Sequence, residues 1–138
     1  MDAIVSNDAI VMEIVRSALN NISAEMGTAV VRGGYSTSIK EGGDASNAIF
    51  DAAGRLIAQG DSTPLLHLCS LRPSLGEVIK DFPLDTMKDG DVYLTNDPFR
   101  GGIHSNDILL FKPVFHEGVP AFFTGTLIHV ADVGGMSA

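Results

Sequence analysis

Hydrophobic residues near the N-terminus recur at every fourth position, which predicts one long amphipathic helix over residues 8–32. The recurring positions are Ile10, Ile14, Ala18, Ile22 and Met26. Polar residues at 6–8 can cap the start of this helix, and two glycines at 33–34 end it. The apolar stripe is wide enough to face either a core or a partner subunit.

After this helix the pattern becomes polar, and residues 35–44 are expected to form a loop. Two short apolar runs, at 47–50 and 55–59, flank the turn sequence at 51–54 and predict a β-hairpin. The serines, threonine and charged residues at 36–41 could bind a carboxylate or a phosphate, or they could simply be solvated.

The middle of the chain is less regular. Residues 61–71 are apolar but are interrupted by Pro64, so we expect an irregular segment there. A short helix is expected over 72–81, beginning near Pro73, because proline is favoured in the first turn of a helix. A strand follows at 91–95.

The second half is rich in β-branched and aromatic residues. Strands are expected at 108–115 and 120–130, joined by a glycine-containing turn at 116–118, which together make a second hairpin. The whole pattern predicts an α+β fold, with a long N-terminal helix followed by mainly antiparallel β-hairpins and short helices.

Length and charge narrow the class of protein. The chain has 138 residues, of which 45% are hydrophobic, and this suits one domain with a real core. A net charge of −8 argues against nucleic acid as a partner. No apolar run approaches the roughly 20 residues that span a bilayer. The acidic N-terminus does not resemble a signal peptide, so we expect a cytoplasmic protein without membrane contact.

The single cysteine and two of the histidines favour ordinary structural roles. Cys69 excludes an internal disulfide, and its apolar surroundings predict a buried, unreactive thiol. His67 lies in the same run and is expected to be an interior residue with satisfied hydrogen bonds. His116 falls in the hairpin turn and is expected to be exposed.

Three other residues should meet at one end of the second hairpin. Asp107 comes just before its first strand and His129 near the end of its second, and these ends of an antiparallel pair are adjacent. His104 lies three residues before Asp107. Two imidazoles and one carboxylate are a common ligand set for a catalytic divalent ion, and Zn, Mn and Fe(II) all fit it. Alternatively, these histidines cap turns or hydrogen-bond in the interior.

Two further aspartates are the next candidates. Asp132 follows His129 by three residues, and Asp97 follows a predicted strand and precedes Pro98. Each could contact the site from an outer shell or act as a base, or it could cap a turn. No G-x-x-x-x-G-K-[ST] phosphate-binding loop is present, so any ATP would have to be bound elsewhere.

At these residues the chain resembles the hydantoinase B and oxoprolinase family. The run LTNDPFRGGIHSNDILLFKPVF resembles the family's NDP-[YF]-x-GG-x-H-x-x-D signature, and HVADVGGM resembles its H-x-A-D-x-G-G segment. Upstream, SIKEGGDASNAIFDAAGRLIAQ is similar to N-I-K-E-R-x-D-F-S-C-A-x-F-D-x-x-G-x-L-x-A. The match departs from this pattern at 42–47, where glycines replace bulky or basic residues.

The resemblance implies a function and a set of partners. The family includes ATP-dependent hydantoinase, oxoprolinase and lactamase subunits, and large subunits of acetone and acetophenone carboxylases. Its carboxylase branch implies a metal held at positions that match His104, Asp107 and His129. We expect Zn or Mn there, and ATP on a hydantoinase A-like partner subunit of a hetero-oligomer. Because family members are several hundred residues long, residues 1–138 are expected to be the N-terminal portion of such a subunit.

Together these observations predict the metal-binding part of an ATP-dependent complex that acts on a small carbonyl substrate. Hydrolysis of a cyclic amide, such as a hydantoin, oxoproline or a lactam, is the preferred reaction. In that reading Asp132 and Asp97 would assist as outer-shell groups or as a base. The alternatives are ATP-dependent carboxylation of a ketone and a non-catalytic assembly role.

Overall fold

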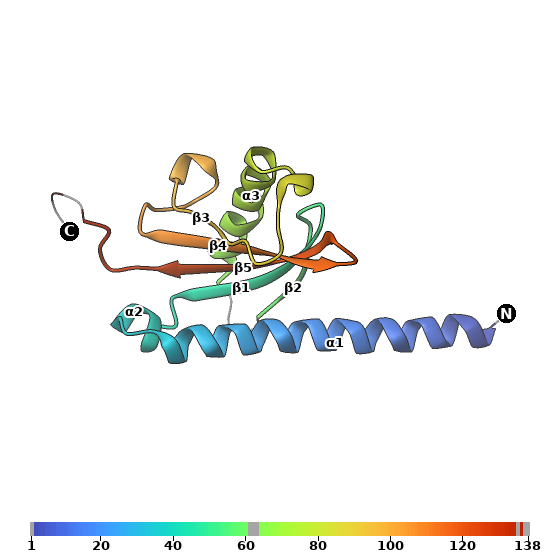
Figure 1. Cartoon of the computed structure of the whole chain (residues 1–138). Helices are drawn as coiled ribbons and strands as arrows, with labels where there is room; N and C mark the ends of the chain where they lie inside the picture. The colour runs from blue at the N-terminus through green and yellow to red at the C-terminus, as the bar shows by residue number, and fades with distance from the viewer. Residues whose placement is uncertain (1, 61–63, 135, 137–138) are drawn as a thin grey trace.

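The protein is built as three layers, with a sheet between two helices (Figure 1). The structure, a computed structural model, describes residues 2–60, 64–134 and 136. Five antiparallel strands form one sheet in the order β2-β1-β5-β4-β3. The long helix α1 lies along one face of this sheet and α3 covers the other. The α+β prediction is therefore confirmed.

The elements lie close to the expected positions in most of the chain. The helices are α1 (Asp2–Gly33), α2 (Thr37–Lys40) and α3 (Leu65–Asp81), with 3-10 turns η1 (Leu84–Thr86) and η2 (Pro98–Arg100). The strands are β1 (Ala45–Asp51), β2 (Leu56–Gln59), β3 (Tyr93–Thr95), β4 (Asp107–His116) and β5 (Val119–His129).

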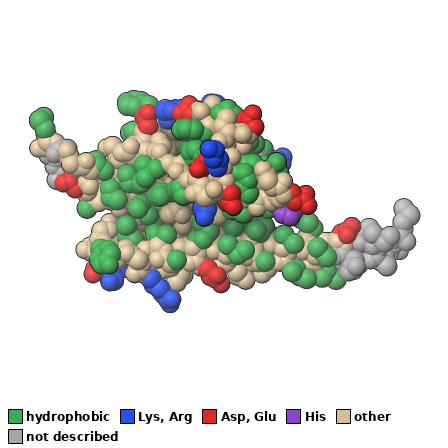
Figure 2. Space-filling view, in the orientation of Figure 1, with side chains coloured by type: hydrophobic (Ala, Val, Ile, Leu, Met, Phe, Trp, Pro, Cys, Tyr) green, Lys and Arg blue, Asp and Glu red, His purple; other side chains and the backbone are tan. Residues whose placement is uncertain are grey.

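Helix α1 contacts the sheet with only part of its length. Its C-terminal half packs on β1 and β2, where the buried Ser23 hydroxyl donates a hydrogen bond of 3.0 Å to the carbonyl of Asn47. Its N-terminal half projects beyond the sheet and leaves Ile10, Met12 and Ile14 exposed. Hydrophobic side chains are visible along this projecting part in Figure 2. The apolar stripe is therefore uncovered along the N-terminal half, and only the C-terminal half of α1 packs on the sheet.

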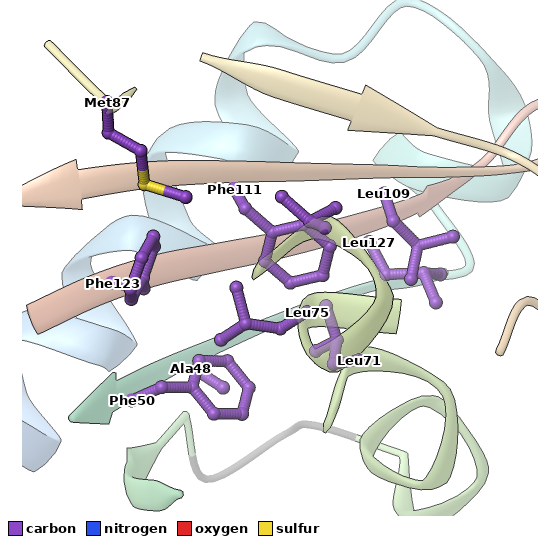
Figure 3. Packing of buried hydrophobic residues seen from close by; sticks show 10 residues of the cluster. Ala48, Phe50, Leu71, Leu75, Met87, Leu109, Phe111, Phe123 and Leu127 are labelled. Carbon is purple, nitrogen blue, oxygen red and sulfur yellow. The ribbon is translucent and has the colours of Figure 1, made fainter. Parts of the chain in front are cut away.

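The core lies between the opposite face of the sheet and α3 (Figure 3). Alternate residues of the three central strands point into it, as a period of two requires. Their partners on α3 are Leu71 and Leu75, both fully buried. Burying each such side chain stabilises the fold by roughly 1.5–3 kcal/mol. The strand residues of this core are Ala48, Phe50, Leu109, Phe111, Phe123 and Leu127.

Three predictions in the first half of the chain are wrong. The segment 61–71 was expected to be irregular, but helix α3 begins at Leu65 and includes its second part. Residues 61–63 of that segment lie outside the described part of the chain. Pro73 was expected to begin a helix but lies inside α3. The helix continues past Pro73 because Leu71 before it and Leu75 after it both pack into the core. The polar loop contains α2, capped by Ser36.

The environment of Cys69 also differs from the prediction. Its thiol is exposed, although its neighbours in the sequence are apolar. The reason is helical periodicity: the buried residues of this segment are His67, Ser70 and Leu71, and Cys69 falls on the outer side of α3. In the described part of the chain, no helix combines the length and the apolar character needed to cross a membrane.

The β4–β5 hairpin matches its prediction closely. Its two strands are joined by a two-residue turn at Glu117 and Gly118, both with positive φ (50° and 81°), which suits the twist of a hairpin. Its far end brings Asp107 opposite His129. This register sets the geometry of the candidate site.

Candidate metal centre

Strand pairing places Asp107 and His129 side by side at the open end of the hairpin. They are direct partners across β4 and β5, on the sheet face that also carries Leu109 and Leu127. The His129 Nδ1 atom lies 2.7 Å from Asp107 Oδ1. Only 1% of the Asp107 side chain is exposed, so this carboxylate forms the buried floor of the site.

A tight turn brings His104 to the same carboxylate. The backbone N–H of His104 donates to Asp107 Oδ2 at 2.9 Å, and the N–H of Asp107 donates to the His104 carbonyl at 3.1 Å. The His104 Nδ1 atom lies 3.3 Å from Asp107 Oδ2. His104 and Asp107 are therefore the first and last residues of a turn, and the Asp107 carboxylate closes this turn by accepting the His104 N–H.

Neighbouring segments hold this turn in place. Asn106 bonds across the hairpin end to Val130, its side-chain amide donating to the Val130 carbonyl at 2.9 Å and its own carbonyl accepting from the Val130 N–H at 2.9 Å. The preceding loop is attached to α3, where the Ser70 hydroxyl donates to the Gly101 carbonyl at 2.7 Å. The position of His104 therefore depends on both the sheet and α3.

The surroundings of Asp107 favour its charged form. Burial by itself raises the pKa of this carboxyl group. The hydrogen bonds from the His129 ring and from the His104 N–H, together with the nearby imidazoles, outweigh burial and hold the pKa of Asp107 below its ordinary value. The site thus keeps a buried negative charge between two imidazoles.

We call His104, Asp107 and His129 the His–Asp–His cluster. One potential ligand atom from each lies within 4.8 Å of the other two. The two imidazole rings are 5.5 Å apart between centroids and nearly perpendicular, at 88°. The exposed fraction of the side chain rises from 1% at Asp107 to 30% at His129 and 58% at His104. The predicted convergence of these residues is confirmed.

This donor set fits a divalent ion. Two nitrogen donors and one carboxylate match the ligands of catalytic Zn and other first-row divalent ions. Because the cluster opens towards solvent through His104, coordination positions would remain for water or substrate. It is the one group of three or more such side chains that could hold a metal among the residues described.

The two aspartates predicted to assist have turn-capping contacts. Asp97 Oδ1 accepts a hydrogen bond of 2.9 Å from the Phe99 N–H and caps η2. Asp132 Oδ1 accepts one of 2.7 Å from the Gly134 N–H. Neither belongs to the His–Asp–His cluster. His116 is exposed at the opposite end of the hairpin, as expected.

A fourth residue, Asp44, lies next to the cluster and was missed by the sequence reasoning. Ala45 pairs with Ile128, and the register continues by one residue, since the His129 N–H donates to the Asp44 carbonyl at 3.2 Å. Asp107 of β4, His129 of β5 and Asp44, just before β1, therefore lie side by side in one row. The pairing of β1 with β5 links residues far apart in the sequence, so no local pattern around Asp44 indicated it.

The chain is similar to known proteins along nearly its whole length. Residues 8–138 match the family described as hydantoinase B/oxoprolinase. The chain is 36% identical to the caprolactamase subunit beta of Pseudomonas jessenii over 128 residues, covering 93% of this chain and 22% of that protein. It is 32% identical to the 5-oxoprolinase of Dictyostelium discoideum, covering 94% of this chain and 10% of that protein. The chain thus spans between about a tenth and a quarter of these relatives.

Two solved structures share the fold. The ATP-dependent caprolactamase from Pseudomonas jessenii superposes with a TM-score of 0.78 at 33% identity, over 93% of this chain and 22% of that one. A nucleotide-free acetone carboxylase superposes with a TM-score of 0.85 at 20% identity, over 95% of this chain and 17% of that one. At this lower identity the second likeness concerns the fold alone.

Proposed function

The chain belongs to the hydantoinase B/oxoprolinase family, and from this premise we propose that it forms the metal-binding part of an ATP-dependent complex acting on a carbonyl substrate. The proposal treats residues 1–138 as the N-terminal portion of a hydantoinase B-like subunit. The observation that carries it is the convergence of His104, Asp107 and His129 on one solvent-facing point.

In this proposal the three side chains of the cluster hold a divalent ion, Zn or Mn. Such an ion would supply Lewis acidity towards a carbonyl oxygen or a bound water. Asp107 contributes the negative charge, because its pKa is depressed and its side chain is buried. The less buried His104 and His129 contribute the nitrogens and line the approach to the site. The cluster is thereby suited to binding and orienting an oxygen-containing substrate.

We infer that the preferred reaction is hydrolysis of a cyclic amide. The support is the 36% identity to a caprolactamase subunit, whereas the likeness to acetone carboxylase, at 20% identity, informs only the fold. Carboxylation of a ketone is the second candidate. In both cases ATP would be bound by a hydantoinase A-like partner subunit, since the sequence has no phosphate-binding loop of the Walker type.

Two further roles belong to the proposal. Asp132 and Asp97 flank the cluster in the sequence and are proposed to assist as outer-shell groups or as a base, in addition to capping their turns. The uncovered apolar stripe on α1, which includes Ile10 and Ile14, is proposed to pack against further polypeptide of a hetero-oligomer. A purely structural subunit is the remaining alternative, and it would need the stripe but not the cluster.

ATP-dependent turnover separates these readings. The full-length protein, purified with its accompanying subunits, is assayed on hydantoin, 5-oxoproline and caprolactam, and on acetone with bicarbonate. We expect ring opening of a cyclic amide that stops after chelation and returns with Zn or Mn. His104→Ala should abolish it, and His116→Ala, which removes an exposed histidine at the other end of the hairpin, should not. Equal activity of both variants would contradict a catalytic role for the cluster.

The same assay tests the two aspartates. If Asp132 or Asp97 takes part in proton transfer, its replacement by asparagine lowers kcat while metal content stays unchanged. An unchanged kcat would assign that residue to its turn alone.

A further inference from the structure

Helix α3 carries a row of polar residues that faces the β3–β4 loop (residues 96–106), the segment that leads to His104. The row repeats at spacings of four, three and four positions, so its members lie on one face of the helix. We call it the polar stripe of α3, and its members are Ser70, Ser74, Glu77 and Asp81.

The serine end of the stripe is in direct contact with the loop backbone. Ser70 and Ser74 are both fully buried. The Ser70 hydroxyl donates to the Gly101 carbonyl at 2.7 Å. Gly101 also lies so close to Ser74 that an added Cβ would be 2.6 Å from the Ser74 hydroxyl oxygen. The loop therefore rests on this end of the stripe through its main chain.

The acidic end of the stripe binds the side chain of the preceding loop residue, Arg100. Its Nη1 atom lies 2.6 Å from Asp81 Oδ2, and its Nη2 atom lies 3.3 Å from Glu77 Oε2. The hydrogen bond from Arg100 lowers the pKa of Asp81, and those to Asp81 and Glu77 raise the pKa of the guanidinium. One cation of the loop thus bridges two carboxylates one helical turn apart.

Apolar packing contributes little to holding this part of the loop. Phe99, the neighbour of Arg100, has 98% of its surface exposed. Beneath Arg100, a hollow of about 620 Å³ opens between α3 and β3, with Tyr93 on its strand side. The attachment of the loop to the acidic end of the stripe is therefore electrostatic. His104 follows Arg100 by four residues.

We propose that Arg100 is a positioning residue, whose ion pairs with Glu77 and Asp81 hold the β3–β4 loop on α3 and so keep His104 beside Asp107. Arg100 stands at the position that the signature NDP-[YF]-x-GG leaves free, so this attachment is a property of the present chain. The consequence for metal binding rests on the proposed function. A role in packing alone would need the stem of the side chain but not its charge.

The same acidic end supplies a matched control. Lys80 pairs with Glu77 as Arg100 does, but it belongs to α3 itself and does not bind the loop to the helix. Arg100→Met and Lys80→Met each remove one cation and keep an unbranched apolar side chain. Hydrogen exchange of the full-length protein in chelator is the first readout, followed at the loop amides. Mn²⁺ affinity, measured by the electron paramagnetic resonance of free Mn²⁺, is the second.

We expect Arg100→Met to lose about three- to tenfold in loop protection and in Mn²⁺ affinity, the scale of one or two partly exposed ion pairs. Lys80→Met should stay within about twofold of the wild type. Between 32% and 44% of each paired side chain is exposed, so salt should screen the attachment. At about 1 M salt, where the screening length is roughly 3 Å, the gap between wild type and Arg100→Met should close to about twofold. Asp81→Asn should add no loss to Arg100→Met, because its partner is already gone.

Three results would overturn the inference while leaving the proposed function in place. They are equal loop protection in the two methionine variants, a gap between wild type and Arg100→Met that high salt does not narrow, and lost protection with unchanged Mn²⁺ affinity. The last would mean that Arg100 holds the loop without positioning His104. Failure of the proposed function looks different, because the wild type would then bind no Mn²⁺ and turn over without metal. Exchange in chelator would still decide whether Arg100 holds the loop.

Discussion

Two clusters at one end of the sheet combine a carboxylate with histidine, and they are arranged in opposite ways. In the His–Asp–His cluster the carboxylate of Asp107 is buried and the imidazoles reach solvent. The second cluster consists of Ser46, His67 and Asp44. Its His67 imidazole is buried and lies 2.6 Å from the Ser46 hydroxyl, and the carboxylate of Asp44 is the more exposed group. The backbone bond between Asp44 and His129 joins the two clusters.

The difference teaches what burial does to each kind of group. A buried carboxylate between imidazoles keeps its charge and holds nitrogen donors near the surface, where an ion can be bound. A buried imidazole anchored by a hydroxyl can only direct its second nitrogen towards the acid beyond it. We therefore propose metal binding for the first cluster.

The largest effect is expected from removing the buried charge of the first cluster. Asp107→Ala should lower Mn²⁺ affinity by more than the roughly 100-fold that loss of an outer-shell partner costs. His116→Ala, at the other end of the hairpin, should leave it unchanged. Titration with Mn²⁺ measures both. An equal loss in the two variants would contradict the assignment of the first cluster.

Replacing Gly101, in the loop before His104, should destabilise the turn that holds His104 without affecting the segment around Asp44. Gly101 has φ of 104°, and an added Cβ would lie 2.6 Å from the backbone nitrogen of Ser74 on α3. Gly90 also has positive φ, 95°, but no atom would approach its Cβ within 4 Å. Strain at positive φ costs about 1–3 kcal/mol for either alanine variant, and only Gly101→Ala adds the clash.

Hydrogen exchange of the full-length protein measures this difference. Gly101→Ala should reduce protection around the His104 turn and weaken Mn²⁺ binding, while the amides near Asp44 stay protected. Gly90→Ala serves as the matched control. Equal effects of the two variants on Mn²⁺ binding would mean that the contact with α3 does not position His104.

Acid should weaken the first cluster in a defined direction. The folded-state pKa of Asp107 is depressed, so its stabilising contribution is complete above the unfolded value near 3.9 and is lost as pH falls through the folded pKa. In chelator, the local free energy of opening at β4, from hydrogen exchange, should therefore fall more steeply below about pH 4 in the wild type than in Asp107→Asn. Parallel profiles would argue against a depressed pKa.

The smallest effect is expected at Cys69, which tests the orientation of α3. His67 is buried and Cys69 exposed two residues later, so they lie on different sides of this helix. Cys69→Ser should change stability by less than about 0.5 kcal/mol. The native thiol should react with a disulfide reagent at nearly the rate seen in denaturant. Strong protection of the thiol would mean that another part of the assembly covers this side of α3.

Features defined by local patterning could be predicted from the sequence. The four-residue repeat located α1, and the glycine turn with its flanking strands located β4 and β5, so the meeting of Asp107 and His129 followed from one hairpin. Features that depend on tertiary packing could not. Pro73 suggested a helix start, but the core partners Leu71 and Leu75 lie on both sides of it in one continuous helix.

Asp44 illustrates the same limit within the site. It immediately precedes β1, and its neighbour His129 ends β5, 85 residues later in the sequence (129 − 44 = 85). Only the pairing of β1 with β5 brings them together, and no spacing rule within the sequence encodes that register. The expected burial of His67 was correct, yet its link to Asp44 became visible only with α3 packed on the sheet.

Metal analysis of the purified full-length protein tests the central claim most directly. The wild type and His116→Ala should each contain close to one Zn or Mn per chain. His104→Ala and His129→Ala should contain little or none while remaining folded. Absence of metal from the wild type after reconstitution with Zn or Mn, or its retention in both cluster variants, would contradict the assignment of His104, Asp107 and His129 as a metal centre.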